Sequence, residues 1–287
     1  MPLRLGSQTF AADESLVMAI VNRTPDSFYD KGSTFGDRDA MTAVDGAVAA
    51  GADIVDIGGV KAGPGGHVDV AEEIHRTVAF IASVRERYPE LIISVDTWRH
   101  EVGDAACHAG ADLLNDAWGG FDPQLARIAA KHDVGLVCTH TGGAAPRTRP
   151  HRATYDDVMG DVVSFVTNET QRALDLGVSP DRLLVDPGHD FGKNTRHSLT
   201  VTRELGRLVD LGWPVLVSLS NKDFVGESLD LPVDQRLVGT LAATAVSSWL
   251  GARVFRVHQP AETSQVLQMV AAVRGQRPPA VARRGLA

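Results

Sequence analysis

The sequence has few cysteines, few aromatic residues and no long apolar segment. Only Cys107 and Cys138 occur in 287 residues, which excludes a disulfide scaffold and favours a reducing compartment. No apolar run approaches the roughly 18 residues that span a bilayer, and Met1–Phe10 lacks the apolar stretch of a secretory signal. Basic residues number 28 against 36 acidic ones, so the net charge of −8 argues against nucleic-acid binding. We expect a cytoplasmic protein that binds neither membranes nor nucleic acid.

The sequence does contain many glycines and a series of short apolar runs. Most runs are continuous rather than alternating, which is typical of parallel strands covered on both faces. Amphipathic stretches of helical length, such as Val70–Tyr88, separate them, and glycines between helix and run suit tight turns. The eight runs are Leu16–Val21, Ile54–Ile57, Leu91–Val95, Leu113–Leu114, Leu136–Cys138, Leu183–Val185, Val215–Val217 and Val254–Val257.

Eight strand–helix units predict a single-domain α/β fold, a (β/α)8 TIM barrel over residues 1–273. A doubly wound open sheet is the alternative. We expect the Pro- and Arg-rich tail, residues 274–287, to be frayed. Polar residues follow the carboxyl ends of the runs, and in a barrel these ends meet on one face, where active sites are built. They are Asn22, Asp56, Asp96, Asn115, Asp116, His140, Asp186, Ser218 and His258.

Several of these segments admit both a functional and a purely structural interpretation. The polar loop Val21–Phe28 is either a mobile functional loop or a capping turn. The Gly-rich loop Asp56–Gly66 either cradles an anion or merely connects, and it lacks the spacing of nucleotide-binding motifs. Asp186 beside Phe191 suits a flat, guanidine-like ring, because a carboxylate accepts two parallel N–H bonds. Taken singly, each residue is also a plausible helix cap or loop residue.

Other chemistries find little support in the sequence. His132 and His140 are too isolated along the chain to predict a zinc site. No nucleophile elbow supports Ser-His-Asp catalysis.

Taken together and in order, the polar segments resemble those of dihydropteroate synthase, over about residues 16–259. The resemblance rests on Asn22–Phe28, Asp56–Gly59, Val95–Thr97, Asn115-Asp116, Asp186–Gly188 with Phe191–Lys193, Ser220 with Lys222, and Arg256–His258. It implies a homodimeric barrel that joins p-aminobenzoate to 6-hydroxymethyl-7,8-dihydropterin diphosphate with Mg²⁺ and releases diphosphate. In that reaction the C–O bond loosens first, because Mg²⁺ and cations stabilise the departing diphosphate. The aryl amine then captures the pterin cation.

The resemblance also implies roles for individual residues. Lys222 and Asp96 would be catalytic, and Asn22 would contribute to the Mg²⁺ site. The pterin pocket would consist of Asp96, Asn115, Asp186, Phe191 and Lys222. The diphosphate would be held by Asn22, Arg256 and His258.

Departures from the family pattern are concentrated in the second half of the site. After Gly59 the family reads Glu-Ser-Thr-Arg-Pro-Gly, whereas this chain has Val60–Gly65 without the Thr and Arg that complete the p-aminobenzoate and diphosphate sites. Asn221 replaces a second arginine, and Thr139 and Thr141 replace two methionines. Asp190 replaces a glycine, which we expect to place a charge in the pocket wall, and Arg23 stands where a small apolar residue is usual.

These departures predict a divergent paralogue with a retained pterin and diphosphate site, a degraded p-aminobenzoate loop and weak or absent synthase activity. One lost charge-stabilising donor costs about 10²–10³ in rate. A working synthase that uses Lys61 and Arg23 instead is the first alternative. A methyltetrahydrofolate-dependent methyltransferase and a non-catalytic regulatory paralogue are the others.

Overall fold

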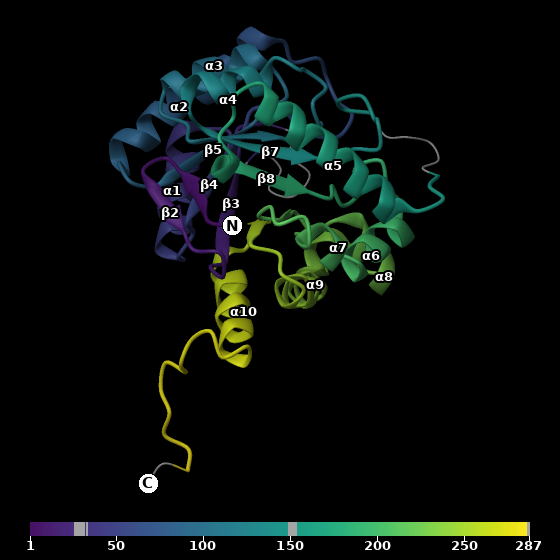
Figure 1. Ribbon diagram of the computed structural model, residues 1–287. Coiled ribbons are helices and arrows are strands. Elements are labelled where there is room, and N and C mark those ends of the chain that lie inside the picture. Colours follow the sequence, from purple (N-terminus) through teal and green to yellow (C-terminus); the bar gives the residue numbers. More distant parts are fainter. Residues whose placement is uncertain (26–31, 33, 149–153, 286–287) are drawn as a thin grey trace.

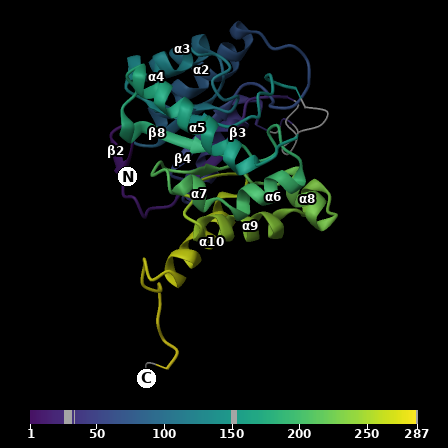
Figure 2. The same cartoon turned by 45° about the vertical axis from the view of Figure 1, so that its right-hand side comes forward.

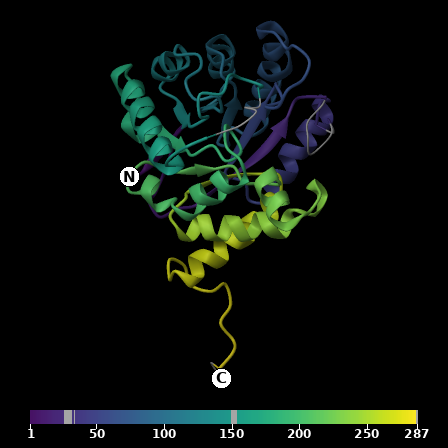
Figure 3. The same ribbon diagram turned by 90° about the vertical axis from the view of Figure 1, so that its right-hand side faces the viewer.

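The eight apolar runs form the parallel strands of one barrel. The computed structural model describes residues 1–25, 32, 34–148 and 154–285. The sheet order is β8-β7-β6-β5-β4-β3-β10-β9, and a parallel bridge between Val185 and Val215 joins its two edges. Figure 3 shows the helices as a ring around the strands. The predicted TIM barrel is therefore confirmed and the open sheet is wrong. The strands are β3 Leu16–Asn22, β4 Ile54–Gly58, β5 Ile92–Asp96, β6 Leu113–Asp116, β7 Gly135–Thr139, β8 Leu183–Asp186, β9 Leu216–Val217 and β10 Val254–Val257.

The helices follow the strands along the chain and cover their outer faces (Figures 1 and 2). The helix predicted within Val70–Tyr88 is α2, which Asp69 caps by accepting the N–H of Glu72. None of the helices in the described part of the chain combines the length and apolarity that a membrane crossing requires. The helices are α1 Asp37–Ala49, α2 Val70–Arg87, α3 His100–His108, α4 Leu125–His132, α5 Val158–Asp175, α6 Thr195–Arg203, α7 Gly206–Val209, α8 Asp223–Leu229, α9 Leu237–Trp249 and α10 Pro260–Val273, with short 3₁₀ turns at Pro180–Arg182 and Val233–Gln235.

An N-terminal hairpin closes one end of the barrel. Its strands β1 (Leu3–Leu5) and β2 (Gln8–Phe10) are antiparallel, and the sequence analysis did not predict them. Leu3, Leu5 and Phe10 join the apolar side chains at the start of the barrel strands in one buried cluster. Arg4 pairs with Asp133 and Asp181, which precede β7 and β8. The hairpin therefore plugs the amino-terminal end and leaves the carboxyl end for a site.

The chain beyond α10 extends away from the barrel (Figure 1). Residues 274–285 are exposed and contain no helix or strand.

Candidate functional site

Alternation along the strands places a layer of polar side chains inside the barrel. Side chains two residues apart in a strand share a face. The inward apolar cluster contains Ile54, Ile92, Leu113, Val137, Leu184, Leu216 and Val254. The residues two positions later along each strand are Asp56, Ser94, Asn115, Thr139, Asp186, Ser218 and Arg256. A polar layer therefore lies directly above an apolar floor, on the carboxyl side that the sequence predicts.

Arg256 on β10 joins two carboxylates from neighbouring strands. Its Nε donates to Asp56 Oδ2 at 2.6 Å, and its Nη2 donates to Asp96 Oδ2 at 2.7 Å. Asp56 also accepts from Ser94 Oγ at 2.6 Å and from Asn115 Nδ2 at 3.3 Å. Burial raises the pKa of Asp96, and the Arg256 guanidinium opposes that effect. Asp96, Asn115 and Arg256 thus belong to one hydrogen-bonded group.

Asp186 ends β8 in a turn of fixed shape. Its Oδ1 accepts the Gly188 N–H at 2.7 Å. Gly188 has φ 65, and a Cβ there would collide with the carbonyl oxygen of His140, so only glycine fits. Burial raises the pKa of Asp186, and the positive charge of Lys222 partly offsets that rise. A carboxylate held in this way can accept N–H bonds from a ligand with its remaining lone pairs.

Lys222, which precedes α8, lies beside Asp186 and Phe191. Its Nζ donates to the carbonyl oxygen of His189 at 2.5 Å and lies 4.9 Å from the Phe191 ring centroid. Burial lowers the pKa of Lys222, while Asp190 and Asp186 oppose the shift. Phe191 packs edge to face on Trp118, with centroids 5.1 Å apart. This part of the site offers an apolar edge beside a buried cation.

Of the two remaining predicted residues, Asn22 is the last residue of β3 and His258 directly follows β10. His258 accepts or donates through Nδ1 to Ser220 Oγ at 3.0 Å, and its backbone N–H donates to the same oxygen. Asn22 Oδ1 and Asp96 Oδ2 both lie within 4.0 Å of the position that a Cβ on Gly58 would occupy. The roles assigned to these residues remain predictions. The last three residues of the loop Val21–Phe28 lie outside the described residues.

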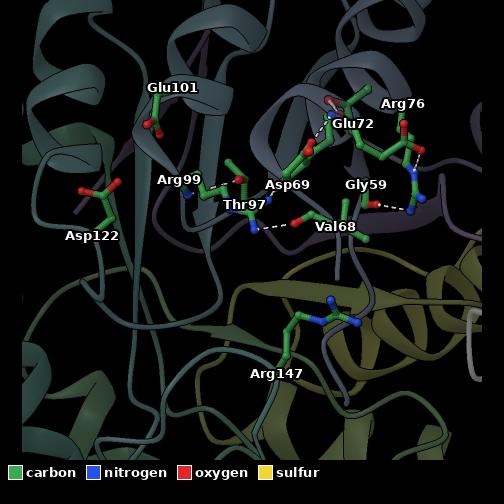
Figure 4. Close-up of polar contacts among 12 residues, drawn as sticks. Gly59, Val68, Asp69, Glu72, Arg76, Thr97, Arg99, Glu101, Asp122 and Arg147 are labelled. Atoms are coloured by element: carbon green, nitrogen blue, oxygen red, sulfur yellow. Dashed lines mark hydrogen bonds and ion pairs between the residues drawn. The ribbon is translucent and has the colours of Figure 1, made fainter. Parts of the chain in front are cut away.

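The loop after β4 packs onto the rim of the barrel. Val60 and Val68 join Trp98 and Trp118 in a separate apolar cluster. Figure 4 shows the arginines around this loop: Arg99 Nη2 donates to the Val68 carbonyl at 2.7 Å, and Arg76 Nη1 to the Gly59 carbonyl at 3.1 Å.

A third arginine, Arg147, donates to the Gly66 carbonyl at 2.5 Å. The Gly-rich loop is thus held by side chains from three other segments rather than left as a loose connection.

Arg23 does not face the site, which removes its part in the working-synthase alternative. Its guanidinium donates to the carbonyl oxygens of Thr34 and Arg76, pairs with Asp37 and stacks 4.6 Å over the Phe80 ring. Arg23 therefore fastens β3 to the helical layer and is not available to bind a diphosphate.

The charge of Asp190 acts on Lys222, whose pKa burial lowers and Asp190 raises, and the Asp190 carboxylate is held by hydrogen bonds. Its carboxylate accepts from Ser198 Oγ at 3.0 Å and from the backbone N–H of Phe224 at 3.2 Å. Its φ of 63 lies in the left-handed region, which glycine adopts most readily. Aspartate tolerates this conformation and caps α8 at the same time.

Lys193, His140 and Asp161 form a chain of polar contacts behind the site that runs from a buried lysine to a half-exposed aspartate. Lys193 Nζ lies 2.6 Å from His140 Nδ1, and His140 Nε2 lies 2.8 Å from Asp161 Oδ2. Burial lowers the pKa of Lys193 to about 7 and that of His140 to about 4. His140 is thus neutral near pH 7 and links β7 to α5 rather than entering the site.

The sequence analysis missed the central role of Asp56 and of Ser94. Asp56 stands among the polar strand ends, but the site assigned by resemblance omits it. Counting alternate residues back from Gly58 along β4 would have placed Asp56 inward, next to Arg256.

Comparisons with known proteins agree with this geometry. A family model described as pterin binding enzyme matches residues 18–258. The chain is 56% identical to a Mycobacterium leprae protein named inactive dihydropteroate synthase 2, with all of both chains covered. It is 36% identical to the dihydropteroate synthase of Haemophilus influenzae, over 88% of this chain and 92% of that one. A crystal structure of Yersinia pestis dihydropteroate synthase with a sulfonamide drug has a TM-score of 0.91 at 33% identity, covering 96% of this chain and 100% of that one. The chain therefore belongs to the pterin-binding enzymes of the dihydropteroate synthase family.

Proposed function

We propose that this protein binds a reduced pterin in the inward polar layer and has lost most or all dihydropteroate synthase turnover. The observation that carries the proposal has two parts. Side chains of the inward polar layer are joined by hydrogen bonds, and the loop after β4 is held against the rim of the barrel by arginine contacts. Asp56, Asp96, Asn115 and Arg256 form one hydrogen-bonded group, and Asp186 is held by the Gly188 turn. The aminopyrimidinone edge of a pterin presents N–H donors that match Asp186.

The charge distribution supports loss of turnover. The Arg256 guanidinium donates to two carboxylates, and Lys222 donates to a backbone carbonyl. The Arg23 guanidinium points into the helical layer. A diphosphate therefore has to displace existing contacts before these cations stabilise it. The arginines that the family places in the rim loop and at position 221 are absent. Since one such donor contributes about 10²–10³ in rate, we expect impairment of 10³-fold or more.

The residues present are compatible with Mg²⁺. Asn22 on β3 and Asp96 on β5 offer oxygen atoms on either side of Gly58 in the intervening strand β4. Mg²⁺ prefers oxygen ligands and shares them with substrate phosphates. Bound there, the ion would supply positive charge to a leaving diphosphate. This chain's own residues would hold the pterin and exclude water from its ring.

Calorimetry separates the two parts of the proposal. We expect 6-hydroxymethyl-7,8-dihydropterin to bind the full chain and Asp186→Asn to weaken binding 10-fold or more, because a bond to a charged group contributes about 1.5–3 kcal/mol. The exposed Asp210→Asn is the matched control. Unchanged binding in Asp186→Asn would place the pterin elsewhere.

A steady-state assay tests the loss of turnover. Turnover with p-aminobenzoate and Mg²⁺ near 1 s⁻¹, within the ordinary enzyme range, would contradict impairment.

A restoration experiment tests the cause of the impairment. Lys61-Ala62-Gly63 is changed to Ser-Thr-Arg and Asn221 to Arg, and synthase activity is measured. Asn221 has φ 56, so the new arginine adopts a left-handed backbone at a cost of about 1–2 kcal/mol. We expect activity to rise by 10-fold or more. An inactive variant that still binds pterin would show that another missing group limits the reaction.

We further propose a homodimer through the outer faces of α9 and α10. The two helices pack against each other, and α9 contains no charged residue. On α9, Val238, Val246 and Trp249 are 80%, 50% and 55% exposed, and on α10 Met269 is 63% exposed. An exposed apolar surface of this kind is typical of a protein interface.

A further inference from the structure

Three metal-ligating side chains meet on the outside of the barrel, away from the polar layer. Asp104 and His108 lie one turn apart on α3, and His132 ends α4. One ligand atom from each of the three lies within 4.8 Å of the other two. The His108 and His132 rings meet edge to face with centroids 4.7 Å apart. His132 stands alone in the sequence, but helix packing brings it to His108.

The chemistry of this set suits a borderline divalent metal. Two imidazoles and one carboxylate are typical zinc ligands, with a water in the fourth position. At metal–ligand distances of about 2.0–2.2 Å, tetrahedral ligand atoms are about 3.4 Å apart, so rotations of partly exposed side chains suffice. His132 Nε2 already lies 2.7 Å from Asp104 Oδ1, and His108 Nδ1 lies 2.8 Å from the Asp104 carbonyl oxygen, a contact that orients its ring.

The Asp104 carboxylate already forms an ion pair with Lys131. Lys131 Nζ donates to Asp104 Oδ1 at 2.6 Å. His132 Nε2 contacts the same oxygen. Lys131 is 55% exposed and can turn into solvent, so a divalent ion can take its place beside the Asp104 carboxylate.

A second group, with two residues from the same helix and Asp122 from the segment before α4, has a different composition. His100, Glu101 and Asp122 also lie close together, but they offer one imidazole and two carboxylates. Asp122 is engaged by the N–H and the ring of His100 and by the N–H of Gln124. Figure 4 shows Glu101 and Asp122 of this group on neighbouring segments. It therefore serves as an internal control.

We propose that Asp104, His108 and His132 form a Zn²⁺ site that ties α3 to α4. The site is separate from pterin binding and does not depend on it. An ion there would join the helices that follow β5 and β6, the strands that carry Asp96 and Asn115.

Calorimetric titration of the tag-free full chain with Zn²⁺ tests the site. We expect one ion per chain with Kd of about 10 µM or tighter. His108→Ala and His132→Ala should each weaken binding at least 10-fold, and His100→Ala should leave it unchanged. Lys131→Met should tighten binding several-fold, because it frees Asp104 without removing a ligand. Circular dichroism of each variant checks that the fold is retained.

Several outcomes would overturn the proposal. They are an absence of stoichiometric Zn²⁺ binding, equal affinity in the folded His108→Ala and His132→Ala variants, loss of affinity in His100→Ala, and no gain in Lys131→Met.

Discussion

At the scale of the residue, Thr139 stands out within the polar layer. It occupies an inward position of β7, in register with Asp186, at a point where the resemblance leads us to expect methionine. Its hydroxyl oxygen is buried and has no hydrogen-bond partner among the described residues. A buried polar atom without a partner costs about 1–3 kcal/mol, so the hydroxyl is better explained by a ligand group than by the fold.

Replacing Thr139 by valine separates these two effects. Thr139→Val keeps the shape and removes the hydroxyl, so we expect the ligand-free protein to gain about 1 kcal/mol in free energy of unfolding. Binding of the dihydropterin should weaken about 5- to 10-fold. Urea denaturation and calorimetry measure the two quantities. A destabilised variant with unchanged pterin affinity would show that Thr139 serves the fold.

At the same scale, the buried Asp116 makes the free energy of unfolding depend on pH. Burial raises its pKa to about 7, although the N–H groups of Gly120 and Trp118 oppose the shift. The folded state therefore holds a proton that the unfolded state has lost above about pH 4. The stability from this group is fully present below about pH 4 and is lost as the pH rises through 7.

Comparison with Asp116→Asn isolates that contribution. The free energy of unfolding of the wild type minus that of the variant should fall between pH 4.5 and 7.5, by at most about 1.4 kcal/mol per pH unit. Urea denaturation across that range measures it. Parallel curves would show that Asp116 titrates normally in the folded protein.

At the scale of the element, the loop after β4 is the segment in which sequence and structure together explain the expected loss of activity. Val60 and Val68 pack with Trp98 and Trp118, and Arg99 and Arg147 each donate to a carbonyl oxygen of the loop. A loop that has to move to admit a second substrate is slowed when contacts of this kind hold it in one arrangement.

Removing one of these contacts should loosen the loop without touching the polar layer. Arg147→Ala loses the bond to the Gly66 carbonyl, and we expect amide exchange in residues 60–68 to accelerate about 5- to 10-fold. The exposed Arg196→Ala is the control. Exchange that is unchanged in both variants would assign the restraint of the loop to Arg99 and the apolar cluster.

Most elements could be predicted because parallel barrel strands carry a strong local signal. Continuous apolar runs located all eight, including the two-residue β9. The hairpin β1–β2 has only three residues in each strand and no run long enough to detect. The inward polar residues were visible at strand ends, whereas the orientations of Arg23 and Asp190 depend on packing partners far along the chain. The approach of His132 to His108 likewise follows from packing of α3 on α4, which no local pattern encodes.

At the scale of the whole molecule, the exposed apolar face of α9 and α10 is the surface through which we expect two copies to form a dimer. Trp249 and Val246 present apolar area without an adjacent charge on the same helix. Burying these side chains against a second copy contributes roughly 25 cal/mol per Å² of apolar area to dimerisation. A carboxylate introduced into the face removes that contribution.

A charge at the centre of this face should separate the two copies. We expect the wild type to have the mass of a dimer in light scattering and Val246→Glu to weaken dimerisation at least 100-fold, because an unpaired charge cannot be buried there. Glu262→Gln, an exposed change on α10, is the control. A dimeric Val246→Glu protein would place the interface elsewhere.

The hairpin at the start of the chain has a practical consequence. Since Leu3, Leu5 and Phe10 close the amino-terminal end, a small molecule can approach the polar layer only from the carboxyl ends of the strands. The first residue lies on the closed side. A tether attached there would immobilise the protein on a sensor surface with the carboxyl ends of the strands turned toward the flowing solution.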